Sequence, residues 1–351
     1  YKANYVHFPD DYTWKGQENS QKNSAFALIK PDKETIWDGT LFTRCDEGSW
    51  VGGAWFGPDK PYSIYGSGTG DPISDPGNFD SVNIWGHGAS RMSALGGTIR
   101  KGELTSPEDE PIRHALKFTI YAKRYLANCD LYGGAPFVWP AQGADGYACN
   151  KGSDNHYQGN NIDFVMGSLL ALPPDLTKED LGIETLAGRK IFDALQTYGG
   201  YPVEDAAWDN WQFFLEEEAV KTDWPAGDHS SITSGRFFEE LKAMISELHV
   251  IKVNTPDSIA GGPTSDHENR LAPVACPPGE FGSGNVCDNS GTSELRDPYK
   301  WPFSKTSIWN MPIGEDAEYY PQPVNPDHID GVMVDADIIV MTPDEDLMPV
   351  Y

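Results

Sequence analysis

Residues 112–121 have the sequence IRHALKFTIY, the strongest signal for a fold class in this chain. Four apolar residues alternate here with four polar ones, and this period of two is typical of a half-buried β-strand: Ile112, Leu116, Phe118 and Ile120 against Arg113, Lys117, Thr119 and Tyr121. A helix that runs through Ala115 and Ala122 is the alternative pattern. We expect a strand, because the alternation persists to the end of the stretch.

Short apolar runs of the same kind recur along the chain and are separated by turns. Glycine (36) and proline (27) together make about 18 % of the residues, against a usual share of about 12 %. The runs that predict further strands are Tyr5–Phe8, Ala25–Ile29, Thr35–Leu41, Val51–Trp55, Tyr201–Glu204, Trp211–Leu215 and Val332–Met341. The sequence therefore predicts a mainly β protein of jelly-roll or β-sandwich type with a few helices.

Two helices are predicted in the second half of the chain. Thr177 and Asp180 form a Ser/Thr-x-x-acid start signal, and the apolar spacing beyond them predicts a helix near residues 184–198. A second amphipathic pattern follows Thr233 and should end near His249.

The composition is that of a folded and strongly acidic chain. Fifty-three Asp and Glu against 26 Lys and Arg give a net charge of −27 over 351 residues, of which 39 % are hydrophobic. A negative field repels phosphate backbones and anionic lipid, so we expect no nucleic-acid partner. Apolar runs such as Ile338–Met341 are far shorter than the roughly 20 residues that a bilayer requires, so no membrane insertion is expected.

The five cysteines form no Cys-x-x-Cys pair that would indicate a zinc or redox site. Cys276 and Cys287 bracket a loop rich in Pro and Gly, which predicts a disulfide that closes this loop. Cys129 and Cys149 flank a similar segment and allow a second disulfide, which leaves Cys45 over. Disulfides indicate an exported, extracellular protein.

The chain divides into three parts by composition. Residues 1–253 are predicted to form the main β-rich domain. Residues 254–299 are rich in Gly, Pro, Ser and Asp, have no periodic pattern and resemble a linker. Residues 300–351 contain a strand pattern that completes either its own domain or a neighbouring one.

Several motifs resemble those of a family of secreted, β-rich microbial proteins. They are WPFSKTSIWNMPIG at 301–314, GGTIRKGEL at 96–104, IRHALKF at 112–118, LALPP at 170–174 and ALQTYGGYPVED at 194–205. Members of the family are mostly uncharacterised, and several are taken to bind or act on polysaccharide. The resemblance implies a secreted β-rich fold and no established catalytic residue.

The order of the motifs differs from that of the family. There the Ser-x-Trp-Asn-x-Pro-Ile segment stands near the start and a stretch like residues 248–259 closes the domain, whereas here the starting motif comes last. Three interpretations follow: a circular permutant, a segment 300–351 that inserts into the next subunit by strand addition, or no rotation at all. The second leads to our first functional expectation, an extracellular structural subunit that assembles with copies of itself, head to tail, into a filament or array.

A polysaccharide-active enzyme is the alternative, with a lyase placed before a hydrolase, and a carbohydrate-binding module comes third. Positive and aromatic residues concentrate where an anionic sugar would bind: Trp85, His87, Arg91, Arg113, His114, Lys117 and Tyr121. In a lyase, His114 or Tyr121 would remove a proton while Arg113 or Lys117 neutralises the carboxylate. However, His114 shares a strand face with apolar residues, which also fits a core histidine.

For a hydrolase the most suggestive carboxylates are Glu204 and Asp205, next to Trp208, Asp209 and Trp211. Aromatic faces stack on sugar rings, and adjacent carboxylates raise the pKa of one another. The alternative is that the tryptophans belong to the core and that the acids are solvated.

No cofactor is predicted other than calcium, which prefers carboxylate oxygens. Two sets of aspartates would allow a calcium site, although neither has the helix-loop-helix pattern. They are Asp327, Asp330, Asp335 and Asp337, or Asp71, Asp75 and Asp80.

Overall fold

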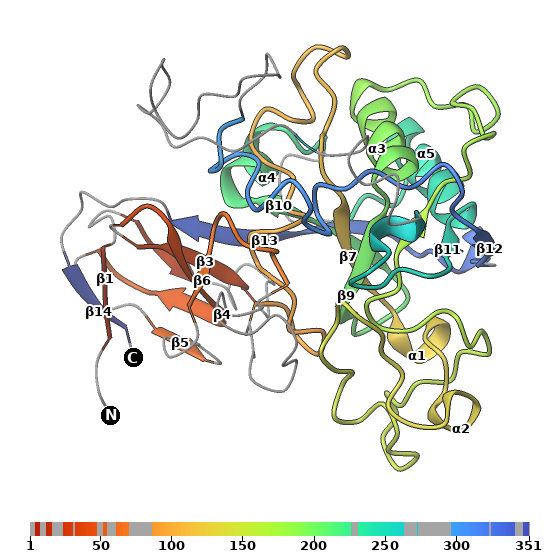
Figure 1. Cartoon of the computed structure of the whole chain (residues 1–351), viewed down its shortest axis with the longest axis horizontal. Coiled ribbons are helices and arrows are strands. Elements are labelled where there is room, and N and C mark those ends of the chain that lie inside the picture. The colour runs from red at the N-terminus through yellow and green to blue at the C-terminus, as the bar shows by residue number, and fades with distance from the viewer. Residues whose placement is uncertain are drawn as a thin grey trace.

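The computed structural model describes twelve stretches of the chain (Figure 1). They are residues 4–7, 12–15, 24–30, 32–47, 52–54, 61–69, 86–225, 231–262, 272, 296–322, 324–340 and 347–350. None of the helices in these stretches is long and apolar enough to cross a membrane.

Most of the described strands form one mixed, 12-stranded sheet. Its order is β12 (Tyr319–Pro321), β11 (His249–Ile251), β8 (Leu170–Ala171), β9 (Gly200–Asp205), β7 (Leu116–Ile120), β10 (Trp211–Glu216), β13 (Val332–Val340), β3 (Phe26–Ile29), β4 (Thr35–Arg44) and β2 (Trp14–Lys15), with β5 (Gly52–Ala54) and β6 (Tyr62–Ser63) also paired to β4. A separate antiparallel ribbon joins β1 (Asn4–His7) to β14 (Leu347–Val350). The predicted mainly β class is confirmed, and three of the pairs, β7 with β9, β10 with β13 and β13 with β3, are parallel.

The strand predicted from IRHALKFTIY is β7, but it begins only at Leu116. The Ala115 N–H, one residue earlier, donates to the Trp309 carbonyl oxygen at 2.8 Å and not to a neighbouring strand. The strand therefore begins after Ala115. A short helix, α1 (Ala122–Tyr125), follows directly, and the helical alternative therefore holds only beyond the end of the strand.

Both predicted helices are present, as α3 (Leu186–Thr197) and α5 (Arg236–Ser246). The residue that caps α3 is Thr185, whose hydroxyl accepts from the Gly188 N–H, rather than Thr177. Thr177 instead closes a hydrogen-bonded turn with Asp180 ahead of the helix. The other α-helices of the described residues are short: α2 (Cys129–Tyr132) and α4 (Glu217–Thr222).

The two faces of the central sheet differ in character. On one face Phe118 packs edge-on against Trp211 and Phe213, and this apolar layer continues through Trp224 to Phe237 of α5. Successive side chains of a strand point to opposite faces, so the residues between these point the other way. That other face carries buried charged groups, which are described below.

Two strands of the segment from residue 300 onward, β12 and β13, belong to the same sheet, whereas β14 pairs with β1 in the separate ribbon. Strand β13 lies between β10 and β3 and joins the two groups of strands that Figure 1 shows on either side of it. Trp309 of the family-like motif is 1 % exposed and lies against Gly96 and Gly97, where a Cβ atom would come within 2.3 and 2.5 Å of the indole ring. The two motifs thus pack on each other, and the glycines are required by this close approach.

The disulfide between Cys129 and Cys149 is present. Cys276 and Cys287, whose pairing the sequence also predicts, lie outside the described residues. Cys45 is exposed and forms no disulfide within the described part of the chain.

Candidate functional site

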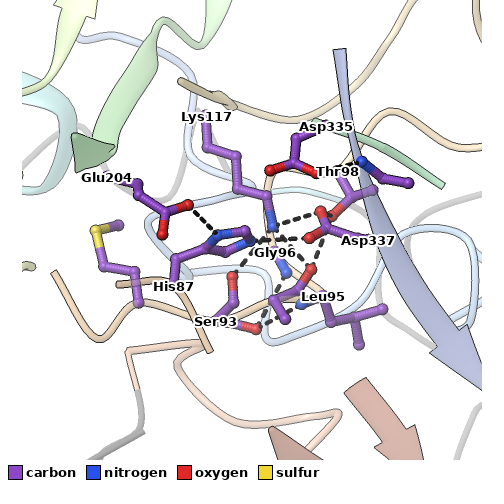
Figure 2. Close-up of polar contacts among 12 residues, drawn as sticks. His87, Ser93, Leu95, Gly96, Thr98, Lys117, Glu204, Asp335 and Asp337 are labelled. Carbon is purple, nitrogen blue, oxygen red and sulfur yellow. Dashed lines mark hydrogen bonds and ion pairs between the residues drawn. The ribbon is translucent and has the colours of Figure 1, made fainter. Parts of the chain in front are cut away.

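The polar face of the sheet carries a buried ion pair between β7 and β13, the two strands on either side of β10 (Figure 2). The Lys117 Nζ of β7 lies 3.0 Å from the Asp337 Oδ2 of β13, and both side chains are fully buried. The same ammonium group donates to the carbonyl oxygens of Ser93 and Ala94, at 3.2 and 2.7 Å. Residues 86–100 therefore cover this face and supply the oxygen atoms that keep a buried lysine hydrogen-bonded.

A buried histidine connects this ion pair to a second acid, Glu204. The Nε2 atom of His87 lies 2.9 Å from the Asp337 Oδ1, and its Nδ1 faces the Glu204 Oε2 at 3.7 Å. Burial and Lys117 oppose protonation of the imidazole, but Asp337 and Glu204 outweigh them and raise the pKa of His87. The ring also packs against Phe214, with 4.2 Å between centroids.

The carboxyl groups beneath the sheet surface differ in charge. Burial alone would raise the pKa of Asp337, but Lys117 and His87 hold it below the ordinary value of an aspartate. Asp335, two residues earlier, has a pKa raised to about 8, first by burial and then by Glu204 and Asp337. At neutral pH Asp337 is therefore the anion of this cluster and Asp335 is largely protonated.

A β-bulge places Glu204 on this face. Phe118 pairs with Pro202 but Thr119 pairs with Glu204, so Val203 is an extra residue in β9. The extra residue shifts the alternation by one, and Glu204 then shares the face of Thr119 and Lys117.

Glu204 and Asp205 together line a cleft with a volume of about 450 Å³. Its wall also includes Arg91, Asp145 and Tyr147. The cleft lies at the end of β9, where the buried charged cluster meets the surface.

Asp205 is a weaker acid in this cleft than an ordinary aspartate. Its carboxylate accepts from the Tyr147 hydroxyl and from the Ala122 N–H, both at 2.8 Å. Burial raises the pKa of Asp205 to about 7, and Asp145 and Glu204 add to the shift. Burial likewise raises the pKa of Asp145, to which the Tyr157 hydroxyl donates. The cleft therefore holds a carboxylic acid that is partly protonated near neutral pH.

The predicted basic cluster is divided between several places. His87 and Lys117 belong to the buried cluster, and Arg91 lines the cleft. His114 is 4 % exposed and its Nε2 lies 3.1 Å from the Glu103 Oε2, the arrangement of a core histidine.

Of the other three residues of that prediction, Arg113 and Tyr121 do not line the cleft, and Trp85 is not among the described residues. Arg113 lies 5.9 Å from the centre of the Trp301 ring, outside the residues that line the cleft. Tyr121 is half-buried at the end of β7. Trp85 lies outside the described residues.

The four aspartates of the calcium prediction do not form one group. Asp335 and Asp337 are buried in the charged cluster, whereas Asp327 and Asp330 are exposed ahead of β13. Among the described residues no three His, Cys, Asp or Glu side chains gather as metal ligands. The alternative set, Asp71, Asp75 and Asp80, lies outside the described residues.

The tryptophans next to the two acids do not line the cleft. Trp211 is fully buried in the core, and Trp208 is 48 % exposed. Asp209 is held by Arg124, with 2.8 Å between Nε and Oδ2. Asp145 and Tyr147, which the sequence prediction did not include, come from the segment that the disulfide closes.

No family model matches the chain, and neither a curated protein nor a solved structure matches it significantly. The interpretation of the cleft therefore depends on its own geometry.

Proposed function

We propose that this chain hydrolyses glycosidic bonds of a polysaccharide in the cleft at the end of β9. The observation that carries the proposal is Asp205, an acid with a pKa of about 7 beside the second carboxyl group of Glu204. Glycoside hydrolysis typically requires such a pair, one protonated and one ionised, on either side of the scissile bond.

The surroundings assign a role to each member of the pair. Asp205 is oriented by Tyr147 and would protonate the oxygen of the leaving sugar. Glu204 faces His87, and the raised pKa of this imidazole favours a positive charge next to the Glu204 carboxylate. Glu204 would stabilise positive charge at the anomeric carbon or activate water.

The charge of the cleft favours hydrolysis over elimination. Three carboxyl groups, those of Asp145, Glu204 and Asp205, line it against a single guanidinium, that of Arg91. A uronate would meet a negative potential here, in a chain whose net charge is already −27. A neutral sugar chain suits the cleft better, so among the enzyme activities we place a lyase after a hydrolase.

The test is a comparison of carboxamide variants on neutral polysaccharides, with reducing ends as the readout. Asp205→Asn and Glu204→Gln should each lower kcat/KM by roughly 100- to 10,000-fold, because each removes one part of the acid–base pair. The matched controls are Asp154→Asn and Glu239→Gln, because both carboxylates are exposed and neither lines the cleft. Unchanged activity in the first two variants would contradict the proposal, and ultraviolet-absorbing unsaturated products from a uronate-rich polysaccharide would favour the lyase.

Head-to-tail assembly is the second candidate function. Its supporting observation is that β13 is an interior strand with a parallel partner on each side, and it follows the 254–299 segment. If β13 of one copy were inserted into the next, every strand pair would be kept and the contact would not close on itself. Regular filaments in electron microscopy would support assembly, and a particle near 38.7 kDa in sedimentation would contradict it.

The disulfide and the resemblance support an extracellular location for either function. Disulfides persist in oxidising environments, and Cys129–Cys149 closes the segment that carries Asp145. Detection of this disulfide in material secreted by the native source would test the location.

A further inference from the structure

A second cavity, of about 290 Å³, lies at another part of the sheet. Trp139, Asp163, Lys252, Val253 and Tyr320 contribute to its wall, and it shares no lining residue with the cleft. The residues come from three places: the segment ahead of the cleft loop, the turn before β8, and the ends of β11 and β12.

Two aromatic residues, Trp139 and Tyr320, contribute to its wall. Tyr320 is 38 % exposed and Trp139 is half-buried, so part of each ring faces solvent. The Lys252 Nζ lies 4.1 Å from the centre of the Tyr320 ring, a cation–π contact between two residues of the wall. Exposed aromatic faces beside fixed polar groups are the usual components of a sugar-binding site.

The backbone at the rim is strained. Val253 has φ of +59° and is 57 % exposed, although this left-handed conformation is unfavourable for a β-branched residue and no burial offsets it. Its neighbours hold it there: the Lys252 N–H donates to the Glu318 carbonyl oxygen at 3.0 Å. The Asn254 side chain contacts the Tyr201 hydroxyl at 3.3 Å and accepts from the Ala260 N–H at 2.9 Å. Strain of this kind is found preferentially at ligand-binding sites.

The charge of the cavity indicates a neutral ligand. Lys252 interacts electrostatically with Asp163, so the one cation and the one anion of the wall offset each other. A phosphate or a uronate would have to compete with Asp163 for the ammonium group. Sugar hydroxyls, in contrast, can donate to Asp163 and accept from Lys252 at once.

We propose that this cavity is a non-catalytic binding site for a neutral sugar chain, with sugar rings on Trp139 and Tyr320 and hydroxyls on Asp163 and Lys252. The site does not require the cleft to be catalytic. Where the cleft is catalytic, the second site would bind the same class of polymer that the cleft hydrolyses.

The experiment is a titration of the Asp205→Asn chain, which prevents turnover, with cellohexaose, mannohexaose and xylohexaose by calorimetry. At least one should bind, and Trp139→Ala and Tyr320→Ala should each weaken its affinity at least tenfold. Trp208→Ala is the matched control, because Trp208 is 48 % exposed but lines neither cavity, and it should leave the affinity unchanged. Tyr320→Ala is informative even if Trp139→Ala does not fold, since the Tyr320 side chain is at the surface.

Two results would overturn the inference: no binding of any of the three oligosaccharides, or equal affinity in the variants and in the control. Hydrolysis separates this site from the cleft. A Tyr320→Ala chain with native Asp205 should lose more activity on a long polysaccharide than on a short soluble substrate, whereas failure of the hydrolase proposal would leave the calorimetric result unaffected.

Discussion

Replacing the buried lysine, Lys117→Met, should destabilise the fold strongly. Methionine fills a similar volume, but it leaves Asp337 without the ammonium group 3.0 Å away and removes the donor to the Ser93 and Ala94 carbonyl oxygens. Removing one partner of a buried ion pair costs about 3–5 kcal/mol. Since His87 still faces Asp337, we expect the lower end, about 3 kcal/mol, which lowers the folding equilibrium constant by roughly 100-fold.

Urea unfolding at pH 7, followed by tryptophan fluorescence, measures this loss. Lys151→Met is the matched control, because the Lys151 side chain is 71 % exposed in its pair with Asp130 and should change the midpoint little. The double variant Lys117→Met/Asp337→Leu should recover much of the stability, since it removes the unpaired charge as well. A loss below about 1 kcal/mol in Lys117→Met would refute the argument that a buried Asp337 carboxylate without its partner carries a large desolvation cost.

The rate of hydrolysis should fall as pH rises through about 7, because Asp205 must be protonated to act as the acid. A pH profile of kcat/KM measures this decrease on the alkaline side. The free energy of unfolding should decrease as pH rises from about 4 to about 8, since the folded state holds the Asp335 proton more tightly than an unfolded aspartate with a pKa near 4 does. Urea midpoints of Asp335→Asn should show a weaker decrease over that range. Cys129→Ser with Cys149→Ser should cost about 3 kcal/mol, because the disulfide closes a segment of 20 residues, and activity should fall with it.

Much of the fold could be predicted from local patterns, because the period of a strand is a local property. The alternation around Leu116–Ile120 located the strand, and the apolar stripe after Thr233 located α5. The alternation could not show that the polar side of β7 is also buried: Lys117 alternates as a solvent-facing residue would, yet residues 86–100 cover it. Burial of a charge depends on partners such as Asp337, 220 positions along the chain, which no local pattern contains.

The candidate site could be predicted in part for the same reason. Glu204 and Asp205 are adjacent in sequence, so their electrostatic interaction was predictable, and it contributes to the pKa of Asp205. Asp145 and Tyr147 reach the same cleft through a loop, and no spacing rule relates them to β9. The bulge at Val203, which places Glu204 toward His87, is likewise a property of pairing with β7.

The buried ion pair can also decide whether β13 is donated between copies. Lys117 belongs to β7 and Asp337 to β13, so a self-completed chain takes both from one copy, whereas a donated strand brings Asp337 from another. We expect Lys117→Met and Asp337→Asn each to lower the urea midpoint when refolded alone. If the two are unfolded together and refolded as a mixture, strand donation would create some domains with both native residues and therefore a fraction that unfolds at the native midpoint. A self-completed fold cannot do this, because every domain then keeps the one defect of its own chain, and the mixture should show only the two lowered midpoints.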